Sequence, residues 1–158
     1  MSVFKTTFSR ALNVFASNDA NIPYPYVITS GTNTSTSSGQ LRDNTTDFTL
    51  LNIKEGDIAY NITNGTAATI IIVKNSTQLD LNADIFTAID QEYVIYQASP
   101  QTGLGNQGCY IYIGDADTNY EVVTIGGDQI IFIAPIRGTV LPLQIIKLIS
   151  GGNCVALW

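Results

Sequence analysis

The sequence predicts an all-β protein, made of small antiparallel barrel or sandwich units with glycine-rich turns. β-Branched residues, mainly Ile and Thr, are abundant, and they favour strands over helices. Apolar residues alternate with small or polar ones through residues 58–63, which is the period of a half-buried strand. Asn64-Gly65 and Gly126-Gly127 are two-residue turns of the kind that join antiparallel strands.

Residues 41–98 are expected to form a first β unit. Several short strands follow one another closely in this segment, with a turn at residues 54–57, which is typical of a small barrel or sandwich. The strand candidates are residues 47–53, 58–63, 67–73, 77–81 and 92–98.

A linker at residues 99–107 precedes a second β unit at residues 108–158, which we expect to pack against the first. Its strand candidates are residues 108–114, 120–125, 128–134, 141–149 and 153–158. The last of these is apolar and ends in Trp158, so it should pair with a strand of the same subunit or of another one. Its candidate interface residues are Val155, Leu157 and Trp158.

Residues 1–40 are predicted to form an amino-terminal arm followed by a flexible linker. Their early apolar residues have the spacing of one face of a short helix. Residues 23–26 must be extended because proline restricts itself and its predecessor. Residues 30–39 lack apolar side chains and indicate an exposed linker. The candidate arm interface is Phe4, Phe8, Leu12, Phe15, Pro23, Tyr24, Pro25 and Tyr26.

Composition excludes several classes of function. With 7 basic and 13 acidic residues, the net charge is −6, and no basic stripe exists for nucleic acid. The absence of His removes Ser–His and Cys–His relays and His-ligated metal sites. No apolar run approaches the ~20 residues of a membrane span. We therefore expect no catalytic residues, no cofactor or metal, and no nucleic-acid or membrane partner.

Two features leave alternatives open. Cys109 and Cys154 lie in apolar, strand-like surroundings, so buried thiols are favoured, although a disulfide would form if their strands were neighbours. The acidic segment Asp115 to Glu121 alternates oxygen ligands as a calcium loop does. However, Tyr120 stands where such a loop needs glycine, so a solvated acidic turn is the better interpretation.

Charges that usually protect strand edges are sparse in this chain. Residues 67–73, 130–133 and 145–146 in particular have few such charges. Open strand edges and an aromatic arm favour pairing between subunits. The residues therefore predict an assembly protein and not an enzyme.

Long stretches of the chain resemble virion structural proteins of tailed bacteriophages, particularly those of marine cyanophages. The segment from residue 47 to residue 86 contains GDIAYNIT and TQLDL, and EYVIY follows at residues 92–96. Residues 11–41 are similar to the start of these proteins, and residues 127–158, with their terminal ALW, to their end.

The resemblance implies a non-enzymatic part of a phage particle that assembles in the host cytoplasm. A capsid decoration or cement protein is the first expectation, with the major capsid protein or other virion proteins as partners. It is also expected to assemble with itself, as a homotrimer or another cyclic oligomer. A neck or tail ring or fibre component is the alternative, and a carbohydrate-binding module contacting the host surface is the second alternative.

Overall fold

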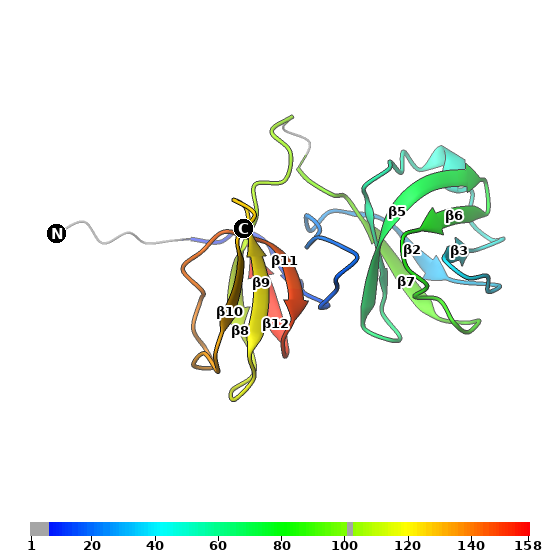
Figure 1. The fold of residues 1–158 in the computed structure, drawn as a ribbon. Coiled ribbons are helices and arrows are strands. Elements are labelled where there is room, and N and C mark those ends of the chain that lie inside the picture. Colours follow the sequence, from blue (N-terminus) through cyan, green and yellow to red (C-terminus); the bar gives the residue numbers. More distant parts are fainter. Residues whose placement is uncertain (1–6, 101–102) are drawn as a thin grey trace.

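The computed structural model describes residues 7–100 and 103–158, which form two β lobes (Figure 1). The described residues contain strands and one 3-10 turn, so the predicted all-β class is confirmed. The first lobe contains β2 (Val27–Thr32), β3 (Gln40–Arg42), β4 (Ile58–Asn61), β5 (Thr66–Asn75), β6 (Gln78–Leu81) and β7 (Glu92–Tyr96). The second contains β1 (Ala11–Asn13), β8 (Tyr110–Ile113), β9 (Tyr120–Thr124), β10 (Gln129–Phe132), β11 (Ile145–Ser150) and β12 (Cys154–Leu157).

The first lobe is one curved sheet with the strand order β2-β7-β4-β5-β6-β3. All of its paired strands are antiparallel. The end strands β2 and β3 share no ladder, and only an isolated bridge between Ser35 and Arg42 links this edge, so the sheet is not a closed barrel. β4 and β5 form the hairpin predicted at Asn64-Gly65, and Gly65 has a φ of +67°. The turn is longer than the predicted two residues, because residues 62–65 connect the paired Asn61 and Thr66.

The second lobe is sandwich-like, with one sheet of order β1-β12-β8 and another of order β10-β9-β11. Their inner side chains form a shared core that includes Ile111, Ile113, Tyr120 and Val122. Alternation along β8 is as expected, because Ile111 and Ile113 are buried whereas Tyr112 is exposed. β9 and β10 form the second predicted hairpin, in which Gly127 has a φ of +91°. Its loop is residues 125–127, inside the hydrogen bond from Thr124 to Asp128, and not the predicted two glycines alone.

The short helix expected in the amino-terminal arm is not formed by the described residues. Residues 11–13 are instead strand β1, which pairs antiparallel with β12. The backbone N–H of Ser9 also donates to the carbonyl of Trp158, at 2.6 Å. Pairing with the carboxyl-terminal strand therefore overrides the helical spacing of the apolar side chains, since packing outweighs such a local pattern. Phe4 lies outside the described residues.

The segment expected to be a flexible linker, residues 30–39, is incorporated into the first lobe. Its first residues complete β2, and Asn33 is fully buried. The Asn33 amide donates to the carbonyl of Ala88 at 2.8 Å, and its oxygen accepts from the N–H of Gln91 at 2.8 Å. Side-chain hydrogen bonds thus order a segment that has no apolar residues to bury.

The strand expected at residues 47–53 is also wrong, because the chain forms the 3-10 turn η1 (Phe48–Leu50) there. The Asp47 carboxylate accepts from the N–H of Thr49 at 3.0 Å and so caps the turn. Phe48 is the buried residue of η1 and packs into the first-lobe core. The segment is therefore held by the Asp47 cap and by burial of the Phe48 ring, and not by the strand pairing that its apolar residues predicted.

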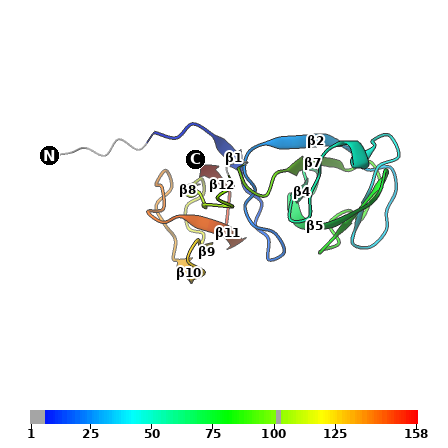
Figure 2. The same ribbon diagram turned by 90° about the horizontal axis from the view of Figure 1, so that it is seen from above.

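Residues 14–22 lie between the two lobes, as the view from above shows (Figure 2). On one side, the N–H of Ser17 donates to Leu148 and that of Ile22 to Ile146, both in β11 and both at 2.8 Å. On the other side, the Ser17 hydroxyl donates to the carbonyl of Ala67 in β5, at 2.9 Å. The segment expected to be a docking arm therefore joins the lobes of its own chain.

Candidate interaction surface

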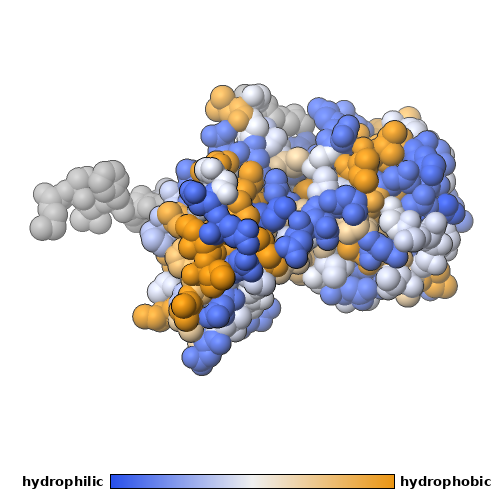
Figure 3. Space-filling model, viewed as in Figure 1, coloured by the Kyte–Doolittle hydropathy of each residue, from blue (hydrophilic) through white to orange (hydrophobic). Residues whose placement is uncertain are grey.

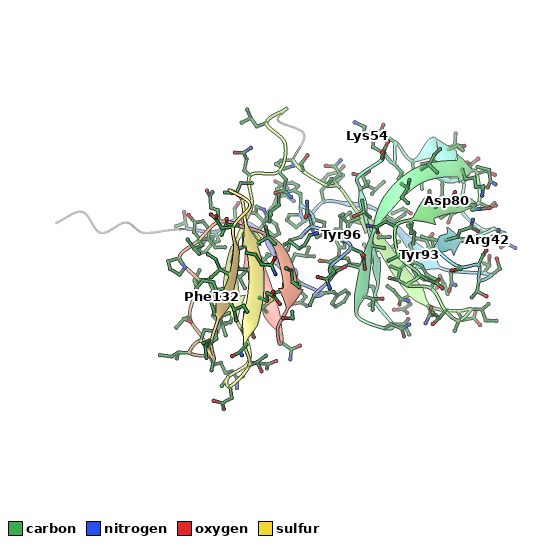
Figure 4. The ribbon with its side chains drawn as sticks, in the orientation of Figure 1. Arg42, Lys54, Asp80, Tyr93, Tyr96 and Phe132 are labelled. Carbon is green, nitrogen blue, oxygen red and sulfur yellow. The ribbon has the colours of Figure 1, made fainter. Side chains whose placement is uncertain are left out.

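β10 is an edge strand, because it pairs only with β9 among the described strands. Its inner side chains, Ile130 and Phe132, pack against the second-lobe core. Phe132 is labelled on this strand in Figure 4. Its outer side chains alternate with them, and Ile131 is 58% exposed. One face of β10 is therefore packed on the core, and the other is exposed to solvent.

The exposed apolar surface continues from β10 into the loop that follows. We call Ile131, Ile133, Ile136, Val140 and Tyr112 the apolar strip. Ile133 and Ile136 are 81% and 76% exposed, so most of their surface meets water. Figure 3 shows hydrophobic residues gathered over the lower left of the molecule, where this lobe lies. Exposed apolar side chains that follow one another in this way are characteristic of interaction surfaces.

Backbone contacts hold the loop of the apolar strip in place. Ala134 has a φ of +40° and donates its N–H to the Asn119 side chain at 3.1 Å, at the end of β10. Further along, the N–H of Gly138 donates to the carbonyl of Ile113 at 2.9 Å, and Val140 bridges to Tyr112. These contacts therefore fix the position of the loop that carries Ile133 and Ile136.

Few charged residues surround the apolar strip. No charged residue lies in the chain between Asp128 and Arg137. Glu121 lies opposite Ile131 on β9, and its carboxylate accepts a hydrogen bond from the Gln129 side chain. A strand edge of this kind lacks the lysines and other charges that commonly prevent edge-to-edge pairing.

A second exposed apolar pair, Ile71 and Ile72, has a different setting. It lies on the part of β5 that pairs with β6, beyond Thr69, where the ladder with β4 ends. Lys74 follows on the same strand and forms an ion pair with Asp80 at 3.6 Å; Asp80 is labelled in Figure 4. This pair therefore lies beside an ion pair, whereas residues 129–136 of the apolar strip carry no charge, and β10 is the stronger candidate.

The residues of the expected arm interface make contacts within their own chain. Phe8 lies 5.7 Å from Tyr110, measured between ring centroids, and Leu12 packs near Phe15 against the junction of the lobes. Pro23 is buried, and the ring of Tyr24 lies 6.0 Å from that of Trp158, measured between centroids. The Arg10 guanidinium donates to the carbonyl of Pro25 at 3.2 Å. Tyr26 is 50% exposed. Of the described members, Tyr26 is the most available to a partner.

The carboxyl-terminal strand pairs within the same chain, which decides between the two alternatives left open by the sequence. β12 lies between β1 and β8, with Val155 opposite Tyr112 and Leu157 opposite Tyr110. Trp158 is half-buried against Tyr24 and the second-lobe core. Both backbone edges of β12 are therefore occupied.

Cys109 and Cys154 are free and buried. Cys154 lies opposite Ile113, and the same register places Cys109 opposite Trp158, four positions along the sheet. At about 3.3 Å per residue this separation is ~13 Å, well beyond disulfide reach. Burial raises the pKa of both thiols to about 12. They are core residues, as the favoured interpretation predicted.

The acidic segment after β8 has a structural role in the described protein. The Asp115 carboxylate accepts from the backbone N–H of Asn153 at 2.7 Å and so fastens the turn before β12. Among residues 7–100 and 103–158, no group of three Cys, Asp or Glu side chains is arranged to hold a metal ion. That part of the chain also contains no helix long and apolar enough to cross a membrane.

A hollow of about 250 Å³ in the first lobe contains titratable side chains, among them Lys54, labelled in Figure 4, and Asp57. Asp57 accepts backbone N–H bonds from Lys54 at 2.8 Å and from Ala98 at 3.0 Å. Its carboxylate therefore closes a turn and fastens the end of β7. Both hydrogen bonds give Asp57 a structural role at this hollow.

Comparison with models of protein families, with curated proteins and with solved structures gives no match. Sequence reasoning identified the weakly protected edge at residues 130–133 but did not include Ile136 and Val140. The run IIFIAPIRGTV carries the signal for both, because apolar residues continue in it beyond the predicted strand.

Proposed function

We propose that this protein is a non-enzymatic structural component of a tailed-phage particle, in the first place a capsid decoration or cement protein. The observation that carries the proposal is the apolar strip, an exposed and nearly uncharged surface on the edge strand β10, the loop that follows it and Tyr112 of β8. In a chain with a net charge of −6, such a surface fits a molecule that is covered after assembly. The sequence resemblance to virion proteins supplies the kind of assembly.

The way the chain uses its polar groups also supports a structural role. The carboxylates in the folded core accept several hydrogen bonds and stabilise turns. Asp43, 1% exposed, accepts from Tyr93 at 2.7 Å and from Thr46 at 2.8 Å. Burial would raise the pKa of Asp43, but hydrogen bonds from Thr45, Tyr93 and Thr46 outweigh it and hold the pKa below its ordinary value. A carboxylate held ionised in this way serves stability.

Assembly through the apolar strip has a physical driving force. Complete burial of one large aliphatic side chain contributes roughly 1.5–3 kcal/mol. The strip offers Ile131, Ile133 and Ile136, each more than half exposed. Repetition of one contact over a symmetric shell multiplies its effect, because neighbouring copies bind with high effective concentration.

Co-sedimentation of the purified chain with phage particles that lack it tests this proposal. We expect the wild-type chain to sediment with the particles and Ile136→Lys to bind at least tenfold more weakly. Leu50→Lys is the matched control, since Leu50 is 79% exposed in the other lobe, and it should bind as the wild type does.

Two results would contradict the proposal. One is the absence of any sedimentation of the wild-type chain with particles. The other is binding to host glycans in an array, which would favour the carbohydrate-binding alternative. Binding confined to isolated necks or tails would move the protein to the ring or fibre alternative within the virion.

A further inference from the structure

We propose that β10 pairs with β10 of a second copy of this chain, antiparallel and centred on Ile131. The proposal goes beyond the assignment to a particle, because it concerns the unit that assembles and holds for the purified protein in solution. It concerns the backbone edge of β10, which pairs only with β9 among the described strands.

The outward peptide groups of β10 lack partners among the described residues. The N–H of Thr124 donates to the carbonyl of Asp128 at 2.9 Å, which fixes where the β9–β10 hydrogen bonds fall. In an antiparallel pair these bonds alternate along the strand. The peptide groups of Ile130 and Phe132 therefore face β9, and those of Gln129, Ile131 and Ile133 face away from it. Three consecutive outward positions form a free edge.

Two copies of this edge can pair about a two-fold axis, and no charged residues then lie opposite each other. With Ile131 opposite Ile131 of the second copy, Gln129 lies opposite Ile133 in both directions. The two outward sets of peptide groups then satisfy one another, as an isologous contact requires. The result is one continuous sheet across both copies, with the β10 strands at its centre.

Charge favours the antiparallel arrangement. In a parallel pair the two copies of Asp128 would lie side by side, which is destabilising. In the proposed register they lie at opposite ends, six residue positions apart, which is ~20 Å at about 3.3 Å per residue. The two Glu121 carboxylates, on the β9 strands, are three strand spacings apart, or ~14 Å, which is beyond the screening length of ~10 Å at 0.1 M salt.

Disulfide formation by Ile131→Cys tests the centre of this register. Opposed residues in a hydrogen-bonded antiparallel pair have Cα atoms about 5.5 Å apart, within the range that a disulfide spans. Mild oxidation should convert most of the variant into a covalent dimer of twice 17.0 kDa. Leu50→Cys, exposed in the other lobe, is the control and should stay largely monomeric. Equal cross-linking of both variants would overturn the register.

Sedimentation equilibrium of the wild-type chain tests the pairing itself. We expect a mass of twice 17.0 kDa for the wild type, and a shift of at least tenfold toward monomer for Ile131→Lys. Ile133→Lys is a second variant on the same edge, and circular dichroism shows that each one folds. A wild-type monomer at all concentrations, a trimer, or a dimer indifferent to both variants would contradict the proposal. Each of these results leaves the co-sedimentation test of the particle role unaffected.

Discussion

The ring of Phe15 lies 4.7 Å from the ring of Tyr60, measured between centroids, and this contact joins the amino-terminal segment to the first lobe. Phe15 precedes Ser17, whose backbone pairs with β11 of the second lobe. Tyr60 is 2% exposed, so the contact is part of the folded interior. Phe15 thus helps to hold the two lobes together.

Replacement of Phe15 by alanine is expected to weaken this junction. Phe15 is half-buried, so Phe15→Ala should lower the free energy of unfolding by about 2 kcal/mol, below the cost at a fully buried phenylalanine. Urea denaturation measures the change. Phe8→Ala is the control, because Phe8 contacts Tyr110 within the second lobe only and should cost less. Equal costs for the two variants would contradict the role of Phe15 at the junction.

Acid should destabilise the protein through Asp43. Because the pKa of this carboxyl is lowered in the folded state, its contribution is present above the unfolded value of about 4 and is lost as pH falls through the folded value. Tyr93→Phe removes one donor and should cost about 1–2 kcal/mol at pH 7, and less at pH 3. Urea midpoints at both pH values measure this.

Tyr110→Phe serves as the control for the acid experiment, since Tyr110 contacts Phe8 and lies away from the Asp43 group. It should leave the dependence of stability on pH unchanged. A cost of Tyr93→Phe that is the same at pH 3 and pH 7 would show that Asp43 does not depend on this hydroxyl.

Cys109 and Cys154 should resist alkylation in the native protein. With pKa values raised to about 12 by burial, almost no thiolate forms at pH 8, and reagents also have little access. Mass spectrometry after iodoacetamide treatment should show no label in buffer and two labels in denaturant. Rapid native labelling, or fewer than two reactive thiols after unfolding, would disprove this account.

The same shifts predict a loss of stability in alkali. Unfolded thiols ionise near pH 8.5, whereas the folded thiols stay neutral to about pH 12. The unfolded state therefore binds fewer protons in this window, and the free energy of unfolding falls as pH rises through it. Cys154→Ala should flatten this fall relative to the wild type in denaturation curves recorded between pH 8 and 10. An unchanged slope would contradict the assignment.

Gly151 is required where the chain passes from β11 to β12. A Cβ atom at Gly151 would lie 2.6 Å from the Tyr120 ring, which is fully buried. Gly151→Ala should therefore cost about 1–3 kcal/mol. At Gly126 the nearest atom to an added Cβ is 3.6 Å away, so Gly126→Ala is the control and should change the melting temperature little. Similar losses in both variants would contradict this reading.

The sequence predicted the strands from β4 to β12 and both hairpins because their signals are local, but it did not predict β1, β2 and β3. Asn64-Gly65 and the alternation of β8 each express a rule that acts over a few residues. The failures are long-range. Residues 11–13 became a strand because they pair with residues 155–157, and Asn33 became buried because it bonds Ala88 and Gln91. No local pattern shows either contact.

The candidate surface was predicted in part for the same reason. The sequence shows that residues 130–133 lack the charges that usually protect a strand edge. The docking role expected of Phe8, Phe15 and Tyr24 is not visible in the structure, where these rings pack on Tyr110, Tyr60 and Trp158. Sequence alone does not distinguish aromatic residues that pack within a chain from those that bind a partner.

Quantitative mass spectrometry of purified phage particles tests the central proposal most directly. The chain should be present in a simple ratio to the major capsid protein, as a component that covers the shell lattice requires. About six to twelve copies per particle would instead indicate a ring or fibre at the unique vertex, because closed cyclic symmetry sets such numbers. Complete absence from purified particles would contradict the virion role.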